Sequence, residues 1–160
     1  MSRFKKSGSQ ILSTLADYEE AVLESMVEQL IELLEGDGVR PATDDPFAQW
    51  EADMAEPNGL DTSDPVVARL FPPAYRDDPK ADQEFRRFTE TAQRRTRIEQ
   101  ANTVLSALME TNAGRDPVLV RRIEAEAWLK TIAAIRLSLS VRLGIETADD
   151  LEALEQLDDD

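Results

Sequence analysis

The stretch ARLFPPAYRDDP, residues 68–79, decides how the chain folds, because it forces two helices to meet at a corner. An Asp-Pro pair at 64–65 precedes it and is a helix-start signal, with Asp as N-cap and Pro at the first helical position. The prolines at 72–73 end that helix, since each lacks an amide donor and disfavours helical conformation in the residue before it. A second Asp-Pro pair, at 78–79, begins a new helix that we expect to run to about Thr111.

Two more stretches carry apolar residues at helical spacing. Residues 17–35 begin with Asp17 and Glu20, which are spaced as a capping box. Residues 126–143 form a wide apolar stripe and are followed by Gly144, a common stop for a helix. Both stretches are therefore predicted to be long helices.

The apolar positions of these helices are expected to form the core. In the helix that begins at residue 79, the predicted core-facing positions include Phe85 and Phe88. Arg136 continues the line of Trp128 and Ile132 at steps of four residues. We therefore expect its guanidinium to be drawn toward the core, where it pairs with a carboxylate or helix-end carbonyls, or binds an anionic ligand.

Two short β-rich runs complete the prediction. QILSTL, residues 10–15, and VLVRRI, residues 118–123, can pair as strands, although a helix from Asp116 is the alternative for the second run. We favour the strand because of its β-branched residues. Shorter helices are expected at 47–55 and after Thr147. The fold class is thus mainly α: a compact bundle of about five to six helices with a small two-stranded β pairing.

Charge is divided unevenly along the 160 residues. The net charge is −15, and it is contained in an acidic connection at 36–64, net −7, and an acidic C-terminal tail at 146–160, net −8. Residues 65–145 carry fourteen bases against ten acids. With 41% hydrophobic residues, we expect residues 1–160 to form a single helical domain with a mildly basic body.

The composition excludes several classes of chemistry. The chain has no Cys and no His, which removes thiol and imidazole nucleophile systems, disulfides and the usual ligands of transition metals. We predict no catalytic residues, no cofactor and no metal site. No apolar run is long enough for a signal peptide or a membrane span, so a cytoplasmic location is expected.

Two blocks of sequence carry a resemblance to a known family. They are DPVVARLFPPAYRDDPKADQEFRRFTE at 64–90 and EAWLKTIAAIRLSLSVRLGI at 126–145, supported by RFKK at 3–6 and EEAVLESMVEQLIELLEG at 19–36. In these blocks the chain resembles an actinobacterial family, domain of unknown function 2017. The resemblance implies a small, mainly helical cytoplasmic protein without an established enzymatic activity.

The same resemblance implies a regulatory role. Some relatives are described as transcriptional regulators of oxidative-stress responses that sense through paired cysteines and associate with a sigma factor. Because this chain has no Cys, thiol sensing does not carry over. What remains is an expected protein partner in the cytoplasm, for example in the transcription machinery.

Nine residues are candidates for interaction with a partner: Tyr75, Arg76, Arg86, Arg87, Arg94, Arg95, Arg97, Arg136 and Arg142. At the corner, Arg76 and the acids at 77–78 either stabilise the turn or are presented to a partner protein. The arginine-rich stretch at 86–97 is a solvated helix face, a surface for an acidic partner or for the chain's own tail, or a strip that contacts phosphates. We hypothesise that the tail at 146–160 lies near this strip and screens it.

The leading functional prediction is a non-enzymatic regulatory or adaptor protein that acts through protein–protein interaction. A direct DNA-binding regulator that uses the helix from Arg86 to Arg97 is the alternative, and a carboxylate-based hydrolase is a remote one. A homodimer is also expected, since small residues flank the apolar stripe of the last long helix and permit close approach: Ala133, Ala134, Ser138 and Ser140.

Overall fold

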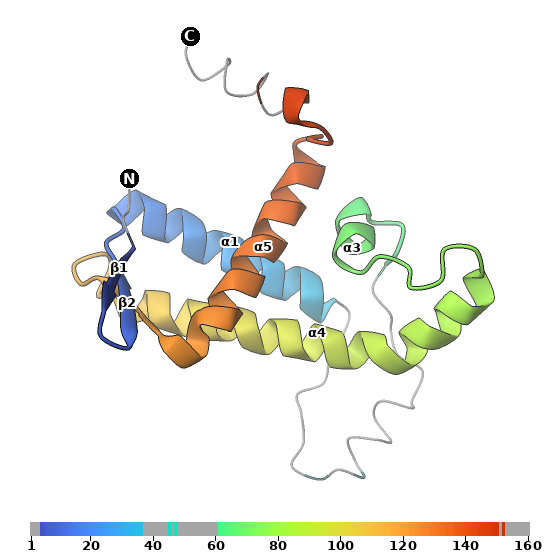
Figure 1. Cartoon of the computed structure of the whole chain (residues 1–160), viewed down its shortest axis with the longest axis horizontal. Coiled ribbons are helices and arrows are strands. Elements are labelled where there is room, and N and C mark those ends of the chain that lie inside the picture. The colour runs from blue at the N-terminus through green and yellow to red at the C-terminus, as the bar shows by residue number, and fades with distance from the viewer. Residues whose placement is uncertain (1–3, 37–44, 46, 48–60, 151, 153–160) are drawn as a thin grey trace.

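Three long helices form the main part of the structure. The computed structural model describes residues 4–36, 45, 47, 61–150 and 152. Within them, α1 (Asp17–Glu35) packs along α4 (Pro79–Met109), and α5 (Ala125–Arg142) lies across both (Figure 1). The short α3 (Pro65–Leu70) packs against α5. The predicted mainly helical fold and the helix–corner–helix arrangement are confirmed.

A small antiparallel sheet lies at the end of the bundle away from α3 (Figure 1). Its order is β1 (Lys5–Ser7), β2 (Gln10–Ser13) and β3 (Val118–Arg121). The predicted pairing of β2 with β3 is confirmed, and β1 is an addition that the sequence analysis did not foresee. A 3-10 turn, η1 (Arg122–Glu124), leads from β3 into α5.

Acidic side chains at the helix starts follow the sequence signals with one exception. The Asp64 carboxylate accepts from the Val66 amide at 2.7 Å, and Asp78 accepts from Ala81 at 3.0 Å, as N-caps do. The predicted capping pair of α1 is wrong. Ala16 is the N-cap there, and Glu19 rather than Glu20 accepts from its amide at 2.9 Å.

The core is one cluster shared by the helices and β3. Its buried apolar residues are Val27, Leu30, Leu34, Val66, Val67, Leu70, Phe71, Ala101, Val104, Leu108, Val118, Val120, Trp128, Ala134 and Ile135. The Glu20 carboxylate is buried as well and accepts a short hydrogen bond from the Thr111 hydroxyl. This bond links the start of α1 to the residues that follow α4.

Two predictions about the core are wrong. Phe85 and Phe88 are 39% and 67% exposed, because α1 ends opposite Arg94 and leaves the first half of α4 without a helical neighbour on that side. Arg136 is exposed rather than drawn inward. The apolar side of α5 is turned so that Ala134 and Ile135 are buried instead.

Parts of the expected structure lie outside the described residues. The helix expected at 47–55 does so apart from Phe47, whose amide donates to Asp45 at 2.9 Å. The helix expected after Thr147 begins at residue 148, and the Asp150 carboxylate accepts from the Thr147 amide at 2.8 Å. Most of the acidic connection and of the tail also lies outside the described residues, and the single-domain prediction stays a prediction.

A turn of left-handed residues connects α4 to β3. Asn112, Ala113 and Gly114 have φ values of 55°, 57° and 75°. The backbone there passes close to α1, so that a Cβ added to Gly114 would lie 2.7 Å from Oδ1 and 3.4 Å from Cα of Asp17. Gly114 therefore meets two requirements, a positive φ and a close approach.

We expect Gly114→Ala to lower the free energy of unfolding by at least about 1 to 2 kcal/mol, the usual cost of a left-handed L-residue, with the clash at Asp17 adding to it. Ala113→Gly is the matched control, since it removes a left-handed alanine and should not destabilise the protein. Urea unfolding followed by circular dichroism measures both. Equal stability of Gly114→Ala and the wild type would contradict the close approach.

Candidate functional site

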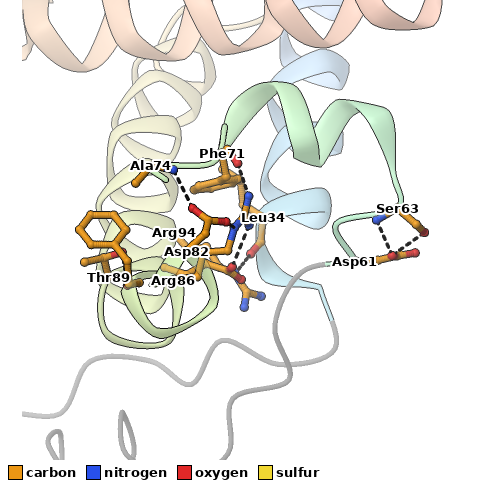
Figure 2. Close-up of polar contacts among 11 residues, drawn as sticks. Leu34, Asp61, Ser63, Phe71, Ala74, Asp82, Arg86, Thr89 and Arg94 are labelled. Carbon is orange, nitrogen blue, oxygen red and sulfur yellow. Dashed lines mark hydrogen bonds and ion pairs between the residues drawn. The ribbon is translucent and has the colours of Figure 1, made fainter. Parts of the chain in front are cut away.

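Arg94 binds the C-terminal end of α1. Its Nε donates to the carbonyl oxygen of Leu34 at 2.8 Å and its Nη2 to that of Glu35 at 2.7 Å (Figure 2). The last carbonyls of a helix lack partners within the helix and carry the negative end of its dipole, so a guanidinium is well suited to them. Arg94 is only 2% exposed. Burial lowers the pKa of its guanidinium, and the charge of Glu90 opposes that shift.

Arg86 and Arg97 bind the end of α3 in the same way. Arg86 Nη2 donates a short hydrogen bond to the carbonyl oxygen of Phe71, and Arg97 Nη2 donates to that of Leu70 at 3.2 Å. The Arg97 guanidinium also lies over the Phe71 ring, 5.0 Å from its centroid, a cation–π distance. Three arginines of α4 thus terminate two other helices.

Asp82 holds the corner, residues 71–78, against the start of α4. Its Oδ1 accepts from the amides of Ala74 at 2.7 Å and Tyr75 at 3.3 Å, and its Oδ2 from Arg86 Nε at 3.2 Å (Figure 2). Burial alone would raise the pKa of the Asp82 carboxyl, but these donors outweigh it and hold the pKa below its ordinary value. The carboxylate therefore stabilises the corner in its ionised form.

An aromatic patch, formed by Tyr75, Phe85 and Phe88, covers the outside of the corner. The rings of Tyr75 and Phe85 meet edge to face, with centroids 5.9 Å apart and an interplanar angle of 78°. Tyr75 is 50% exposed. Phe88 follows Phe85 by three residues, so the two side chains are neighbours on the same side of α4. The patch is thus an exposed apolar surface on a braced backbone.

A cleft lies between the corner and the first half of α4. Its volume is about 200 Å³. Phe71, Phe85 and Pro72 contribute apolar wall, while Thr89 and Gln93 contribute polar groups. Arg86 and Arg97 also line it. We call it the corner cleft.

The remaining candidate residues are placed apart from the corner cleft. Arg87 and Arg76 are exposed, and among the described residues Arg76 has no ion pair. Of the two acids beside Arg76, Asp78 stabilises the corner as the N-cap of α4. Arg95 is half-buried. On α5, Arg142 donates to Gln29 of α1 at 3.4 Å.

The arginine-rich stretch 86–97 is therefore only in part the solvated face that was one prediction for it, since Arg87 is exposed but the arginines at 86, 94 and 97 are not. Its guanidinium groups at 86, 94 and 97 are turned to carbonyl oxygens of the chain itself. The hypothesis that the acidic tail screens this strip stays untested, since residues 151 and 153–160 lie outside the described residues.

Asp82, Phe85 and Phe88 were missed as site residues in the sequence analysis, which named Tyr75 of the aromatic patch. Two signals could have indicated Asp82: it lies in the first turn of a helix that follows a corner, and it precedes Arg86 by four residues. The exposure of Phe88 could have been inferred from the lengths of α1 and α4, which are 19 and 31 residues.

Neither metal binding nor a membrane span is indicated by the described part of the chain. Within residues 4–36 and 61–150, no three acidic side chains gather as they would around a metal ion. Among the same residues, no helix combines the length and the apolar character needed to span a bilayer.

These features define a small, mainly helical protein whose described candidate site is a braced corner with an aromatic patch and an arginine-lined cleft. The chain belongs to the family called domain of unknown function (DUF2017), whose model matches residues 1–160, the whole chain. Searches of curated proteins and of solved structures gave no match.

We expect Arg94→Gln to lower the free energy of unfolding by roughly 2 to 4 kcal/mol, because it removes two charge-assisted hydrogen bonds and leaves buried carbonyls unpaired. Arg87→Gln removes the same charge from an exposed position of the same helix and should change it by less than about 0.5 kcal/mol. Urea unfolding measures both variants. Similar losses in the two would show that charge, not the helix-end contact, matters.

The stabilising effect of Asp82 should depend on pH. Since its pKa is below the ordinary 3.8 in the folded protein, its contribution is present above that value and is lost as the pH falls through the folded-state pKa. We expect Asp82→Asn to be less stable than the wild type at pH 7, and the difference to shrink as the pH falls below the ordinary pKa of the carboxyl group. Thermal unfolding across this range tests it. A difference that stays constant with pH would contradict the role of the ionised carboxylate.

Proposed function

We propose that the protein is a non-enzymatic adaptor or regulatory protein that binds a partner protein through the aromatic patch. The observation that carries this proposal is the exposure of Tyr75, Phe85 and Phe88 together on one braced corner. Exposed aromatic side chains are costly to keep in water and are enriched at the centres of protein interfaces.

The bracing of the corner favours binding as well. Asp82 accepts hydrogen bonds from two backbone amides of the corner, and Arg86 donates one to a backbone carbonyl. The corner therefore loses little conformational entropy when a partner binds. A partner would also find polar groups at the edge of the patch, including Thr89 and Gln93. This combination of an apolar centre and a polar rim is typical of protein interfaces.

A cytoplasmic partner in transcriptional or stress regulation, such as a sigma factor, is the first class to test. It is proposed on the resemblance noted in the sequence. Self-association stays a prediction too. Of the small residues expected at a dimer face, Ala133 is exposed, whereas Ala134 is buried in the core.

Direct DNA binding through the helix from Arg86 to Arg97 has weaker support. Phosphate binding needs guanidinium donors that are free to face the solvent. Arg86, Arg94 and Arg97 donate instead to carbonyl oxygens, and Arg87 is the exposed member of the strip.

A carboxylate-based hydrolase also has weaker support at this site. Asp82 and Glu90, the two acids that line the corner cleft, both pair with Arg86, at 3.2 and 3.4 Å. This arrangement favours ionised, structural carboxylates over an acid and base with separated pKa values.

The proposal is tested by affinity purification of tagged full-length protein from native cytoplasm, followed by mass spectrometry and by binding assays with each purified partner. We expect Phe88→Ser to weaken binding of the partner at least tenfold, since truncation of a hot-spot side chain at the centre of an interface costs about 2 kcal/mol or more. Leu129→Ser is the matched control, because Leu129 is 73% exposed on α5, away from the corner. Circular dichroism confirms that both variants are folded.

Two outcomes would contradict the proposal. One is a partner that binds Phe88→Ser as well as it binds the wild type. The other is recovery of no specific partner while the pure protein converts a metabolite in an activity screen.

A further inference from the structure

Arg97 differs from the two other arginines of the corner in lacking a carboxylate. Arg86 pairs with Asp82 and Glu90, and the charge of Glu90 also acts on Arg94. Among the described residues, Arg97 has a carbonyl oxygen and the Phe71 ring as partners but no carboxylate within ion-pair distance.

The Arg97 side chain is nevertheless partly removed from water. Burial lowers the pKa of its guanidinium, and no neighbouring negative charge opposes this shift. A guanidinium has five N–H donors in a planar fork, and one of them is used on Leu70. An anion bound there would restore hydrogen bonds and charge that burial has removed.

The space beside Arg97 can hold such an anion together with an apolar group. The corner cleft measures about 200 Å³, whereas a cavity of roughly 150 Å³ is enough for benzene. Phe71 and Phe85 form apolar wall, and the Gln93 amide offers hydrogen-bond donors. Drug-sized ligands need about 300 Å³ or more, so the cleft fits a small molecule or one side chain.

We propose that the corner cleft is a binding site for a carboxylate attached to a small apolar group, with the carboxylate held by the fork of Arg97. A carboxylate matches the planar fork in shape, since both present two parallel contacts. Its single charge also suits a cleft that already contains Asp82 and Glu90, which would repel a dianion. This inference does not depend on the protein partner proposed above.

The test is a titration of isotope-labelled full-length protein with benzoate, followed by nuclear magnetic resonance. We expect saturable shifts at millimolar concentration for the amides of Thr89 and Gln93. Benzamide, which has the same shape without the charge, and inorganic phosphate should bind at least about tenfold more weakly. Arg97→Gln should lose about tenfold or more in benzoate affinity, whereas Arg87→Gln, on the exposed face of the same helix, should not.

A second pair of variants is needed because Arg97→Gln removes the contacts of Arg97 with the end of α3 and could change the structure of the cleft. Gln93 is exposed at the cleft, so Gln93→Glu and Gln93→Lys change the charge there while leaving the core intact. We expect Gln93→Glu to weaken benzoate binding and Gln93→Lys to strengthen it. Absence of saturable binding by the wild type, equal binding of benzoate and phosphate, or no change in either Gln93 variant would overturn the proposal.

The carboxylate could come from a free acid or from an acidic side chain of a protein. Titration with N-acetyl-glutamate amide, a blocked amino acid, separates these sources. Tighter binding of benzoate than of the blocked glutamate assigns a free acid with an apolar body, and the reverse order assigns a side chain. Each order supports the carboxylate site as long as benzoate itself binds saturably, whereas failure of benzoate to bind overturns it.

Discussion

The structure depends on the contact between arginine side chains of α4 and the carbonyl ends of other helices. Every helix that ends inside a protein leaves carbonyl oxygens that need donors. Here one helix supplies them to two others: Arg94 to α1, and Arg86 and Arg97 to α3. The position of each arginine along α4 therefore fixes where its neighbours end. The corner and its cleft follow from this arrangement, because α3 is held where its last residues face the first half of α4.

Local signals allowed much of this fold to be predicted from the sequence. The Asp-Pro pairs at 64–65 and 78–79 act within a few residues, and so do the β-branched residues of β3 and the stop at Gly144. The roles of the arginines could not be predicted in this way. The sequence shows that Arg94 is charged, but it does not show that the C-terminal end of α1 lies next to Arg94 in the fold. That position decides whether the Arg94 side chain faces water or a carbonyl oxygen.

The misplaced phenylalanines have a similar cause. Helical spacing correctly put Phe85 and Phe88 on one side of α4, but a core face also needs a partner of equal length. Helix α4 has 31 residues and α1 has 19, a difference of about 18 Å at 1.5 Å per residue. The aromatic patch lies on the part of α4 that extends past α1. A surface suited to binding is thus produced by a mismatch in helix length.

The sheet ties together parts of the chain that are far apart in the sequence, since Gln10 pairs with Arg121. Closing such a long loop carries an entropic cost and slows folding. During synthesis on a ribosome, β2 has no β3 to pair with until more than a hundred further residues have been translated and have left the exit tunnel. The helices α1, α3 and α4 emerge before then, so they can pack first. The N-terminal hairpin is thus among the earliest segments to be made and among the last to reach its final place.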